Sequence, residues 1–499
     1  MQNINLNLIA VLAALTLSGV LSHTAAATSY STKYEYDAMR RVVKTITPDN
    51  SYIKNTYDDD GQLIYVEKYN SSNVLLQRTH TKYTPSGQVD KTYGPECFTY
   101  PTGAENFSSA ECNITTNYYD ALDRVKVVKD GEGRKTKTIY YPDGKPHKII
   151  KAWQGNPDNA AEVANDNDAC TIANTNQQCY ATYTYSDNGM ETSVKDANGN
   201  LTEYFYDGFD RLSKFQLPHP TTTGISNPND YEQYTYDANG NMLTKRKRDG
   251  KIITNAYDAL NRVTSKTPQG QTAVVYSYDK IGRQTTVKFA NNDHPVSHTY
   301  DSAGRLISTS DNGRILAYDY DPAGNRTKVQ WPDGYYATYA YDNLNRVQTI
   351  KENGSATLAT YVYDPAGRRA SVTYGNGTIT SFSYHDDDAL KTLSHNVGGT
   401  ADDVDWTYGF NKVNQLTSKT LNGGSNLNLY KWEPLHKKTD SYTANGLNQY
   451  SSVASNSLSY DDSGNLTSDG VWNYTYDVEN MLLTASRSGA SASYLYDPL

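Results

Sequence analysis

Residues Tyr257–Arg283 read YDALNRVTSKTPQGQTAVVYSYDKIGR and contain one pattern twice. Tyr257-Asp258 returns as Tyr278-Asp279, and the pair then recurs every 20 to 22 residues, at Tyr300-Asp301, Tyr320-Asp321, Tyr341-Asp342 and Tyr363-Asp364. A fixed period of this length is typical of repeat proteins, in which each unit packs mainly on its neighbours. The period therefore takes precedence over the division into several domains that 499 residues would otherwise suggest.

Three residues after the Asp of each pair stands Gly, Asn or Asp. These residue types enter the left-handed backbone region most readily, and an Asp that opens a turn can bond its own backbone two residues on. The combination predicts a type I turn with a left-handed bulge residue, which closes a β-hairpin. We predict this structural role for Asp258 with Asn261, Asp279 with Gly282, Asp301 with Gly304, Asp342 with Asn345, and Asp364 with Gly367.

The spacing predicts an antiparallel strand on each side of every such turn. A second turn signal, such as Asp249-Gly250 or Asn312-Gly313, follows about ten residues later. In Tyr276–Asp279 (YSYD) the two tyrosines are two residues apart, so both point to one face, which we expect to be the inner or packed face. The sequence thus predicts an all-β fold, a long antiparallel hairpin strip that strand twist coils into a partial, hollow, cocoon-like shell.

The composition limits the function classes. Only 37% of residues are hydrophobic, but 45 tyrosines supply aromatic area that favours strands. A net charge of −9 argues against a nucleic-acid partner, which would need a basic face. We find no Ser-His-Asp set, phosphate loop or metal motif, and therefore predict no catalytic residue, no cofactor and no metal ligand.

The N-terminus and the cysteines predict export. An apolar run from Leu8 to Leu21 precedes Ala25–Ala27 and resembles a cleaved signal peptide over residues 1–27, although its start lacks Lys and Arg. No later stretch could span a membrane, so we expect a secreted or cell-surface protein. The disulfide candidates are Cys97, Cys112, Cys170 and Cys179. Three pairings are possible, and the two local ones are the simplest.

The repeats divide the chain. We expect repeats at 28–94, a Cys-bounded insertion at 95–116, repeats at 117–151, a loop insertion with the second Cys pair at 152–180, a dense array at 181–384, degenerate repeats at 385–450 and truncated terminal repeats at 451–499.

Two charged stretches could suggest a binding site, but a structural interpretation is simpler for both. We expect Lys245–Arg248 (KRKR) to be a solvated strand edge rather than an anion site, and His385–Leu390 (HDDDAL) a surface acidic cluster rather than a calcium loop.

The recurring Tyr-Asp-x-x-Gly-Arg-Leu pattern resembles the RHS, or YD-repeat, family over most of Tyr36–Asp497. The resemblance implies a β-strip wound into a hollow shell, as in bacterial RHS polymorphic toxins, where the shell holds a C-terminal toxin. That family usually closes its repeats with a signature core that contains an Asp-Pro-x-Gly element and is linked to self-cleavage, and we find no such core after the repeats of this chain. The chain stops at Leu499 in mid-turn, so we expect a fragment that is not itself an enzyme.

Two functions remain open from the sequence. The first is an exported shell segment that encapsulates or presents a toxin or effector polypeptide in intercellular competition or host interaction. The second is an adhesion or carbohydrate-binding module, whose partner would be a cell-surface glycan or protein and whose tyrosines would stack on sugar rings. The placement of the Tyr-x-Tyr face separates them. A buried or cavity-lining face favours the shell, and rings in open solvent favour the module.

Overall fold

The computed structural model describes residues 32–47, 50–107, 112–166, 178–291, 293–397, 403–411, 414–423 and 441–498. The predicted signal peptide and Cys170 lie outside these ranges, and the side chain of Cys179 is not described. Within the described ranges, no helix has the length and apolar character that a membrane crossing requires.

A single antiparallel sheet of 32 strands dominates the structure, and each strand pairs with the next along the chain. Its first half comprises β1 (Lys33–Tyr36), β2 (Val42–Ile46), β3 (Tyr52–Tyr57), β4 (Leu63–Tyr69), β5 (Leu75–Tyr83), β6 (Val89–Tyr93), β9 (Ile114–Tyr119), β10 (Val125–Lys129), β11 (Lys135–Tyr140), β12 (Pro146–Lys151), β13 (Gln178–Tyr185), β14 (Glu191–Asp196), β15 (Leu201–Tyr206), β16 (Leu212–Pro218), β17 (Ser226–Tyr236) and β18 (Met242–Arg246). Its second half comprises β19 (Ile252–Tyr257), β20 (Val263–Pro268), β21 (Val274–Tyr278), β22 (Gln284–Phe289), β23 (Val296–Tyr300), β24 (Leu306–Asp311), β25 (Arg314–Tyr320), β26 (Arg326–Gln330), β27 (Tyr336–Tyr341), β28 (Val347–Glu352), β29 (Ala356–Tyr363), β30 (Arg369–Tyr374), β31 (Ile379–Tyr384), β32 (Leu390–Asn396), β33 (Val404–Phe410) and β34 (Leu416–Gly423).

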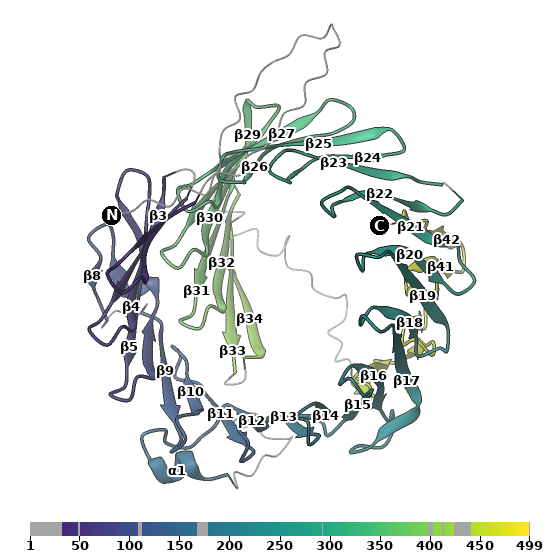
Figure 1. Ribbon diagram of the computed structural model, residues 1–499, viewed down its shortest axis with the longest axis horizontal. Coiled ribbons are helices and arrows are strands. Elements are labelled where there is room, and N and C mark those ends of the chain that lie inside the picture. The colour runs from purple at the N-terminus through teal and green to yellow at the C-terminus, as the bar shows by residue number, and fades with distance from the viewer. Residues whose placement is uncertain are drawn as a thin grey trace, which may run out of the picture.

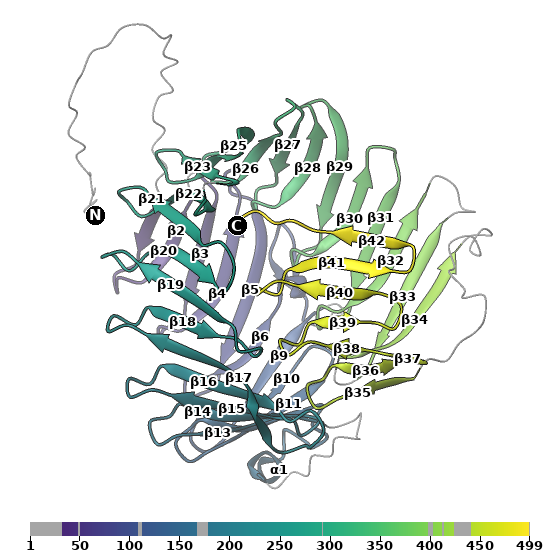
Figure 2. The same cartoon turned by 90° about the vertical axis from the view of Figure 1, so that its right-hand side faces the viewer.

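Two small sheets follow after residue 441. They comprise β35 (Tyr442–Ala444), β36 (Tyr450–Val453) and β37 (Asn456–Ser457), and then β38 (Ser459–Tyr460), β39 (Leu466–Ser468), β40 (Asn473–Tyr476), β41 (Leu482–Arg487) and β42 (Ala490–Ser493). Figure 1 shows the strip coiled around a central space, and Figure 2 shows β35–β42 beside β14–β22. The predicted all-β coiled hairpin strip is confirmed. Regular antiparallel pairing also continues through β32–β34, inside the stretch 385–450 that was expected to be degenerate.

The strip has two edges, which we name for the turns that form them. The YD edge is formed by the turns that begin at the Asp of each Tyr-Asp pair or at its equivalent, as between β19 and β20. The far edge is formed by the other turns, as between β18 and β19 at Asp249-Gly250. Because consecutive strands are antiparallel, the two kinds of turn alternate along the whole chain.

The two insertions interrupt the far edge, and each covers part of one face of the sheet. The loop predicted at 152–180 contains a one-turn helix, α1 (Ala160–Ala164), whose first turn is capped by the Asn159 side chain, which accepts a hydrogen bond from the Ala161 N–H. Trp153, just before the helix, is 2% exposed and packs with Val127, Ile139, Ile150 and Val163. This part of the insertion is therefore a packed cover and not a loop.

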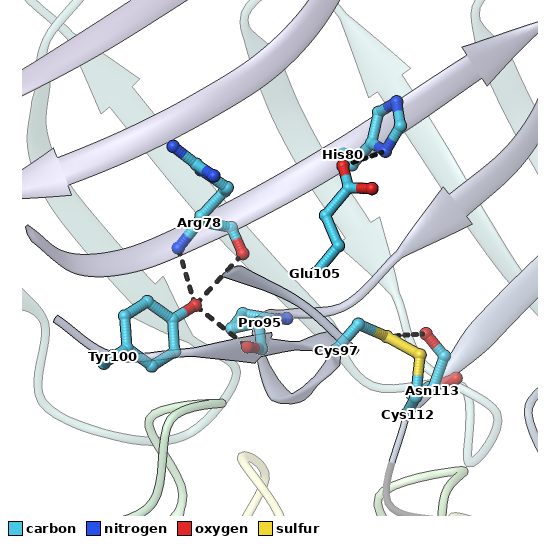
Figure 3. Close-up of a disulfide and its surroundings, with 8 residues drawn as sticks. All are labelled: Arg78, His80, Pro95, Cys97, Tyr100, Glu105, Cys112 and Asn113. Carbon is cyan, nitrogen blue, oxygen red and sulfur yellow. Dashed lines mark hydrogen bonds and ion pairs between the residues drawn. A yellow bond between two sulfur atoms is a disulfide. The ribbon is translucent and has the colours of Figure 1, made fainter. Parts of the chain in front are cut away.

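The second cover is the Cys-bounded insertion, which forms the hairpin β7 (Phe98–Thr99) and β8 (Ala104–Glu105). A disulfide joins Cys97 to Cys112 at its base, which is one of the two local pairings that the sequence left open. Figure 3 shows the Tyr100 hydroxyl accepting from the Arg78 N–H at 2.8 Å and donating to the Pro95 carbonyl at 2.9 Å. The insertion is thus fastened to β5, and both cysteines are buried beneath it.

Candidate functional site

The turn Asp258–Arg262 shows how one repeat is closed. Asn261 has a left-handed φ of 60°, and its N–H donates to the Asp258 carbonyl at 3.0 Å. One oxygen of the Asp258 carboxylate accepts the N–H groups of Leu260 and Arg262, and the other accepts Nε of Arg262 at 2.8 Å. This Arg262 hydrogen bond lowers the pKa of Asp258 below its usual 3.8.

The other turn residues named from the sequence occupy the same positions. Asp279, Asp301, Asp342 and Asp364 each accept the backbone N–H of the Arg four residues on and bind its side chain. The residues with positive φ in these turns are Gly282, Gly304, Asn345 and Gly367. The structure therefore brings each Asp together with its own turn, and each such pair lies on the YD edge.

The same motif also joins each repeat to the next, which explains why tyrosine precedes the aspartate. Arg262 lies 4.7 Å from the ring of Tyr278 and donates to the Asp279 carbonyl at 3.3 Å. In the other direction, the Tyr278 hydroxyl donates to the carbonyl of Val263 at 2.8 Å. The equivalent hydroxyl-to-carbonyl bonds recur at Tyr236, Tyr257, Tyr300, Tyr320, Tyr341, Tyr363 and Tyr384.

Replacing Tyr278 with Phe should weaken this link without disturbing the packing. The ring stays beside Arg262, but the Val263 carbonyl loses its donor, which should cost about 1 kcal/mol of local opening free energy. Hydrogen exchange of β19–β21 measures that free energy. The matched control is Tyr374→Phe, at an exposed tyrosine on the far edge, which should change exchange little. Equal effects of the two variants would contradict the inter-repeat role of the hydroxyl.

The Asp–Arg turns should make the array labile to acid. The pKa of Asp207 and Asp258 is lowered chiefly by the hydrogen bonds from Arg211 and Arg262, relative to an ordinary value of 3.8. A carboxylate with a lowered folded-state pKa contributes stability that is complete above pH 3.8 and is lost as the pH falls through the folded value. We expect the urea midpoint to fall steeply between about pH 4 and about pH 2, and the double variant Asp207→Asn, Asp258→Asn to be less stable at pH 7 with a shallower pH dependence. An unchanged slope would contradict this assignment.

The covers identify which face of the sheet is outside. Val127, under α1, pairs across the ladder with Tyr118, which packs on the same cluster. Both views place α1 on the outer side of the coil (Figures 1 and 2). Successive residues of a strand point to opposite faces. Tyr119, which directly follows Tyr118 and belongs to the pair Tyr119-Asp120, therefore points to the inner face.

The same face can be followed from strand to strand through the cross-strand partners. In each repeat, the residue two positions before the Tyr of the Tyr-Asp pair, or before the residue equivalent to that Tyr, also lies on the inner face. We call this series of residues the inner row. Between β13 and β33, its tyrosine and phenylalanine members are Tyr183, Tyr204, Tyr234, Tyr276, Tyr318, Tyr339, Tyr361, Phe382 and Tyr408. Each faces a cross-strand partner, and these are Val194, Phe215, Lys245, Val287, Val329, Ile350, Val372, Leu393 and Lys419.

Between β13 and β33 these rings are half-buried, whereas most of their neighbours on the outer face are exposed. Tyr276 and Tyr339 are examples, beside the exposed Ser277 and Ala340. Tyr276 and Phe289 pack against Val274, Val287 and Val296, three of the most buried side chains described. The inner face is therefore the apolar face of the strip.

Electrostatics keep the inner row uncharged. Burial raises the pKa of Tyr204 and Tyr276 above the usual 10. Burial and a 2.7 Å hydrogen bond to Glu232 both raise the pKa of Tyr234. The nearby charges are paired, since Lys245 lies 2.8 Å from Glu232. The face can thus contact apolar or aromatic groups, and its chemistry is that of a binding surface.

A second polar system joins successive windings of the coil. We call it the seam, and in it the YD edge of later repeats meets the far edge of earlier ones. Arg134 pairs with Asp387, and Glu132 accepts the Asp386 N–H at 2.9 Å. Farther along, the Asn448 side chain donates to Asp196 at 2.9 Å.

Two sequence interpretations change at the seam. Lys245–Arg248 was expected to be a solvated edge, but Lys247 is 4% exposed and donates to the Val478 carbonyl and to Asn480 at 2.5 Å. Arg248 binds Asp230 and donates to the Ser463 carbonyl at 3.3 Å. The expected surface cluster His385–Leu390 likewise lies against Glu132 and Arg134. These expectations were wrong because the residues lie where two windings meet.

The comparisons with known proteins agree with this geometry. A family model described as RHS Repeat matches residues 185–214, and one described as Teneurin YD-shell matches residues 221–352. These two segments carry the repeats of the RHS, or YD-repeat, family. The chain is 37% identical over 206 residues to the tRNA3(Ser)-specific nuclease WapA of Bacillus spizizenii, and equally to the tRNA nuclease WapA of Bacillus subtilis. Each match covers 40% of this chain and only 8% of the nuclease.

Solved structures share the fold. The crystal structures of TcdB2-TccC3-TEV and of TcdB2-TccC3 without its hypervariable C-terminal region each superpose with a TM-score of 0.55 at 16% identity. They cover 93% of this chain, which in turn spans 26% of theirs. The strip and its coiling thus recur in much longer chains.

Proposed function

We propose that the chain forms part of an exported shell whose inner face holds a polypeptide cargo, such as a toxin or effector used in intercellular competition or host interaction. The observation that carries the proposal is the aromatic inner row on the concave side of the coil. Uncharged rings suit an extended polypeptide of varied sequence, because aromatic area contributes contact energy without requiring a specific charge partner.

Several observations support this proposal beside the inner row. The fold is shared with TcdB2-TccC3 structures, one of which lacks a hypervariable C-terminal region. The matched curated relatives are nucleases, which supports an enzyme as the cargo. In this proposal the shell residues themselves are not catalytic. The division of the chain into repeats and insertions, and export through residues 1–27, belong to the same proposal.

The alternative, an adhesion or carbohydrate-binding module, requires rows of rings that face open solvent. The inner row lies on the concave face and is half-buried, which favours cargo over a glycan or other cell-surface partner. Isolated exposed aromatics occur elsewhere, for example Trp331 with Tyr335, whose ring centroids are 5.3 Å apart. A single such pair does not form the row of exposed rings that a glycan-binding module requires.

Site-specific photocrosslinking tests the proposal. A benzophenone amino acid replaces Tyr339 on the inner row or, as the matched control, the adjacent Ala340 on the outer face. The probe is a fluorescent, reduced and carboxymethylated polypeptide that cannot fold. We expect crosslinks from position 339 that a non-fluorescent unfolded chain competes away, and few from position 340. Equal crosslinking at both positions, or crosslinking at neither, would overturn the shell proposal, and competition by oligosaccharides alone would favour the alternative.

A further inference from the structure

The third residue of each YD turn lies at the tip of the YD edge. At the seam this residue contacts the earlier winding, as for Asp387, whose side chain is 5% exposed beside Arg134, and for Glu479, which accepts from Lys266 at 2.6 Å. In the described repeats before residue 283, several turns expose the same position instead. Five of them carry a large apolar residue there, each 67% to 81% exposed, and these are Met39, Leu122, Phe209, Leu260 and Ile281.

A repeated apolar position along one edge differs from the scattered exposed hydrophobics of an ordinary surface. Other turns of this range carry polar residues at the equivalent position, such as Asp60 and Asn239. The edge therefore combines apolar tips with hydrogen-bond acceptors. In the turns that are docked at the seam, Asp387, Asn448 and Asn480 supply the acceptors.

The opposite edge has an exposed stretch of its own, at the far-edge ends of β24–β33. Six large hydrophobic residues there are 36% to 52% exposed, and these are Ile315, Trp331, Tyr335, Leu358, Tyr374 and Val397. Arg314 in the same stretch projects a side chain that is 74% exposed. Within the seam, the far edge likewise provides the cations, through Arg134, Lys247 and Arg248.

We propose that the YD edge between Asp37 and Arg283 is a docking surface for the far edge of a second copy of this chain, so that copies stack head to tail. The contact continues an interface that the chain already makes with itself, with apolar tips against an apolar rim and acceptors against cations. A second copy is the occupant because each chain carries both halves of this contact. Such a contact between unlike surfaces is not self-limiting and generates an open series of copies.

The area of the contact limits its strength. The ten strands β24–β33, spaced ~4.8 Å apart, give a far edge about 50 Å long. With a width of about 10 Å, each partner would bury roughly 500 Å². The total of about 1,000 Å² is at the lower limit for a specific interface. The stacking should therefore depend on protein concentration.

Sedimentation velocity of the full chain over roughly a hundredfold range of concentration tests the proposal. We expect the wild type to form dimers and longer species, and the YD-edge variant Phe209→Asp, Ile281→Asp to dissociate at least about tenfold more readily. The matched control is Val362→Asp, at an exposed valine of β29 that lies outside the YD edge between Asp37 and Arg283 and at the opposite end of its strand from the far edge, which should behave as the wild type. Circular dichroism verifies that all variants keep the fold.

A mixing experiment then tests the head-to-tail arrangement. The far-edge variant Trp331→Asp, Tyr335→Asp keeps its YD edge, and the YD-edge variant keeps its far edge. Each alone should be monomeric, and an equimolar mixture should form dimers but nothing longer. A wild type that stays monomeric throughout the range, a mixture that does not dimerise, or a Val362→Asp variant that dissociates equally would overturn the proposal.

Discussion

Replacing Trp153 with Ala should cost about 3–5 kcal/mol of local opening free energy, the largest loss that we expect from a single substitution in this chain. The ring is 2% exposed and packs with Val127 and Ile150 under α1. It also lies 4.7 Å from the ammonium of Lys137, a fully buried lysine that donates to the Glu162 carbonyl at 2.8 Å. Loss of the ring leaves a cavity and admits water to a buried charge.

Hydrogen exchange of the segment from β11 to α1 measures this loss, because opening in a repeat array is local. The matched control is Trp331→Ala, since Trp331 is 37% exposed at the far edge and should cost well under about 1 kcal/mol. A second variant is Gly155→Ala, because a Cβ there would overlap the buried Trp153 ring and force it to move. Equal losses at Trp153 and Trp331 would show that α1 is not a packed cover.

Removing the disulfide should be the second largest effect. Cys97 and Cys112 are 15 residues apart, and a loop of that length is stabilised by about 3 kcal/mol when it is closed covalently. The bond anchors the insertion over Tyr93, so Cys97→Ser should expose the aromatic cluster of β4–β6. Protease nicking between Phe98 and Cys112, together with exchange of β6, measures the change.

The single variants Cys97→Ser and Cys112→Ser should lose the same stability, and the double variant should lose no more than either. That equality distinguishes loss of one shared bond from two independent packing defects. A double variant that loses about twice as much would contradict the assignment. The comparison avoids a reducing agent, which would act on every cysteine of the chain.

The turns of this fold could be predicted from the sequence because residue type restricts backbone conformation directly. Asn261 and Gly282 occupy left-handed positions that few other residues adopt readily. The strand period likewise placed Tyr276 and Tyr278 on one face. The identity of the inner face depended on which side the insertions cover, and α1 was missed although Asn159 and Glu162 have the spacing of a helix N-terminal capping box.

The seam could not be predicted, for a different physical reason. Lys247 and Val478 are 231 residues apart, and their meeting depends on a small twist between neighbouring strands summed over the whole winding. A slight change of twist per strand would bring other residues into contact. The charged stretch Lys245–Arg248 was therefore visible in the sequence, but its partners were not.

The seam also gives the shell unequal mechanical strength in two directions. Neighbouring strands share ladders of backbone hydrogen bonds, whereas successive windings are joined by side chains at turn tips, such as Arg134 with Asp387, and by an isolated backbone hydrogen bond from the Gly446 N–H to the Pro220 carbonyl. Tension applied along the coil axis would load the turn-tip contacts first and leave the ladders intact. The molecule would then extend as a spring does, opening a lengthwise gap between windings while each hairpin keeps its shape.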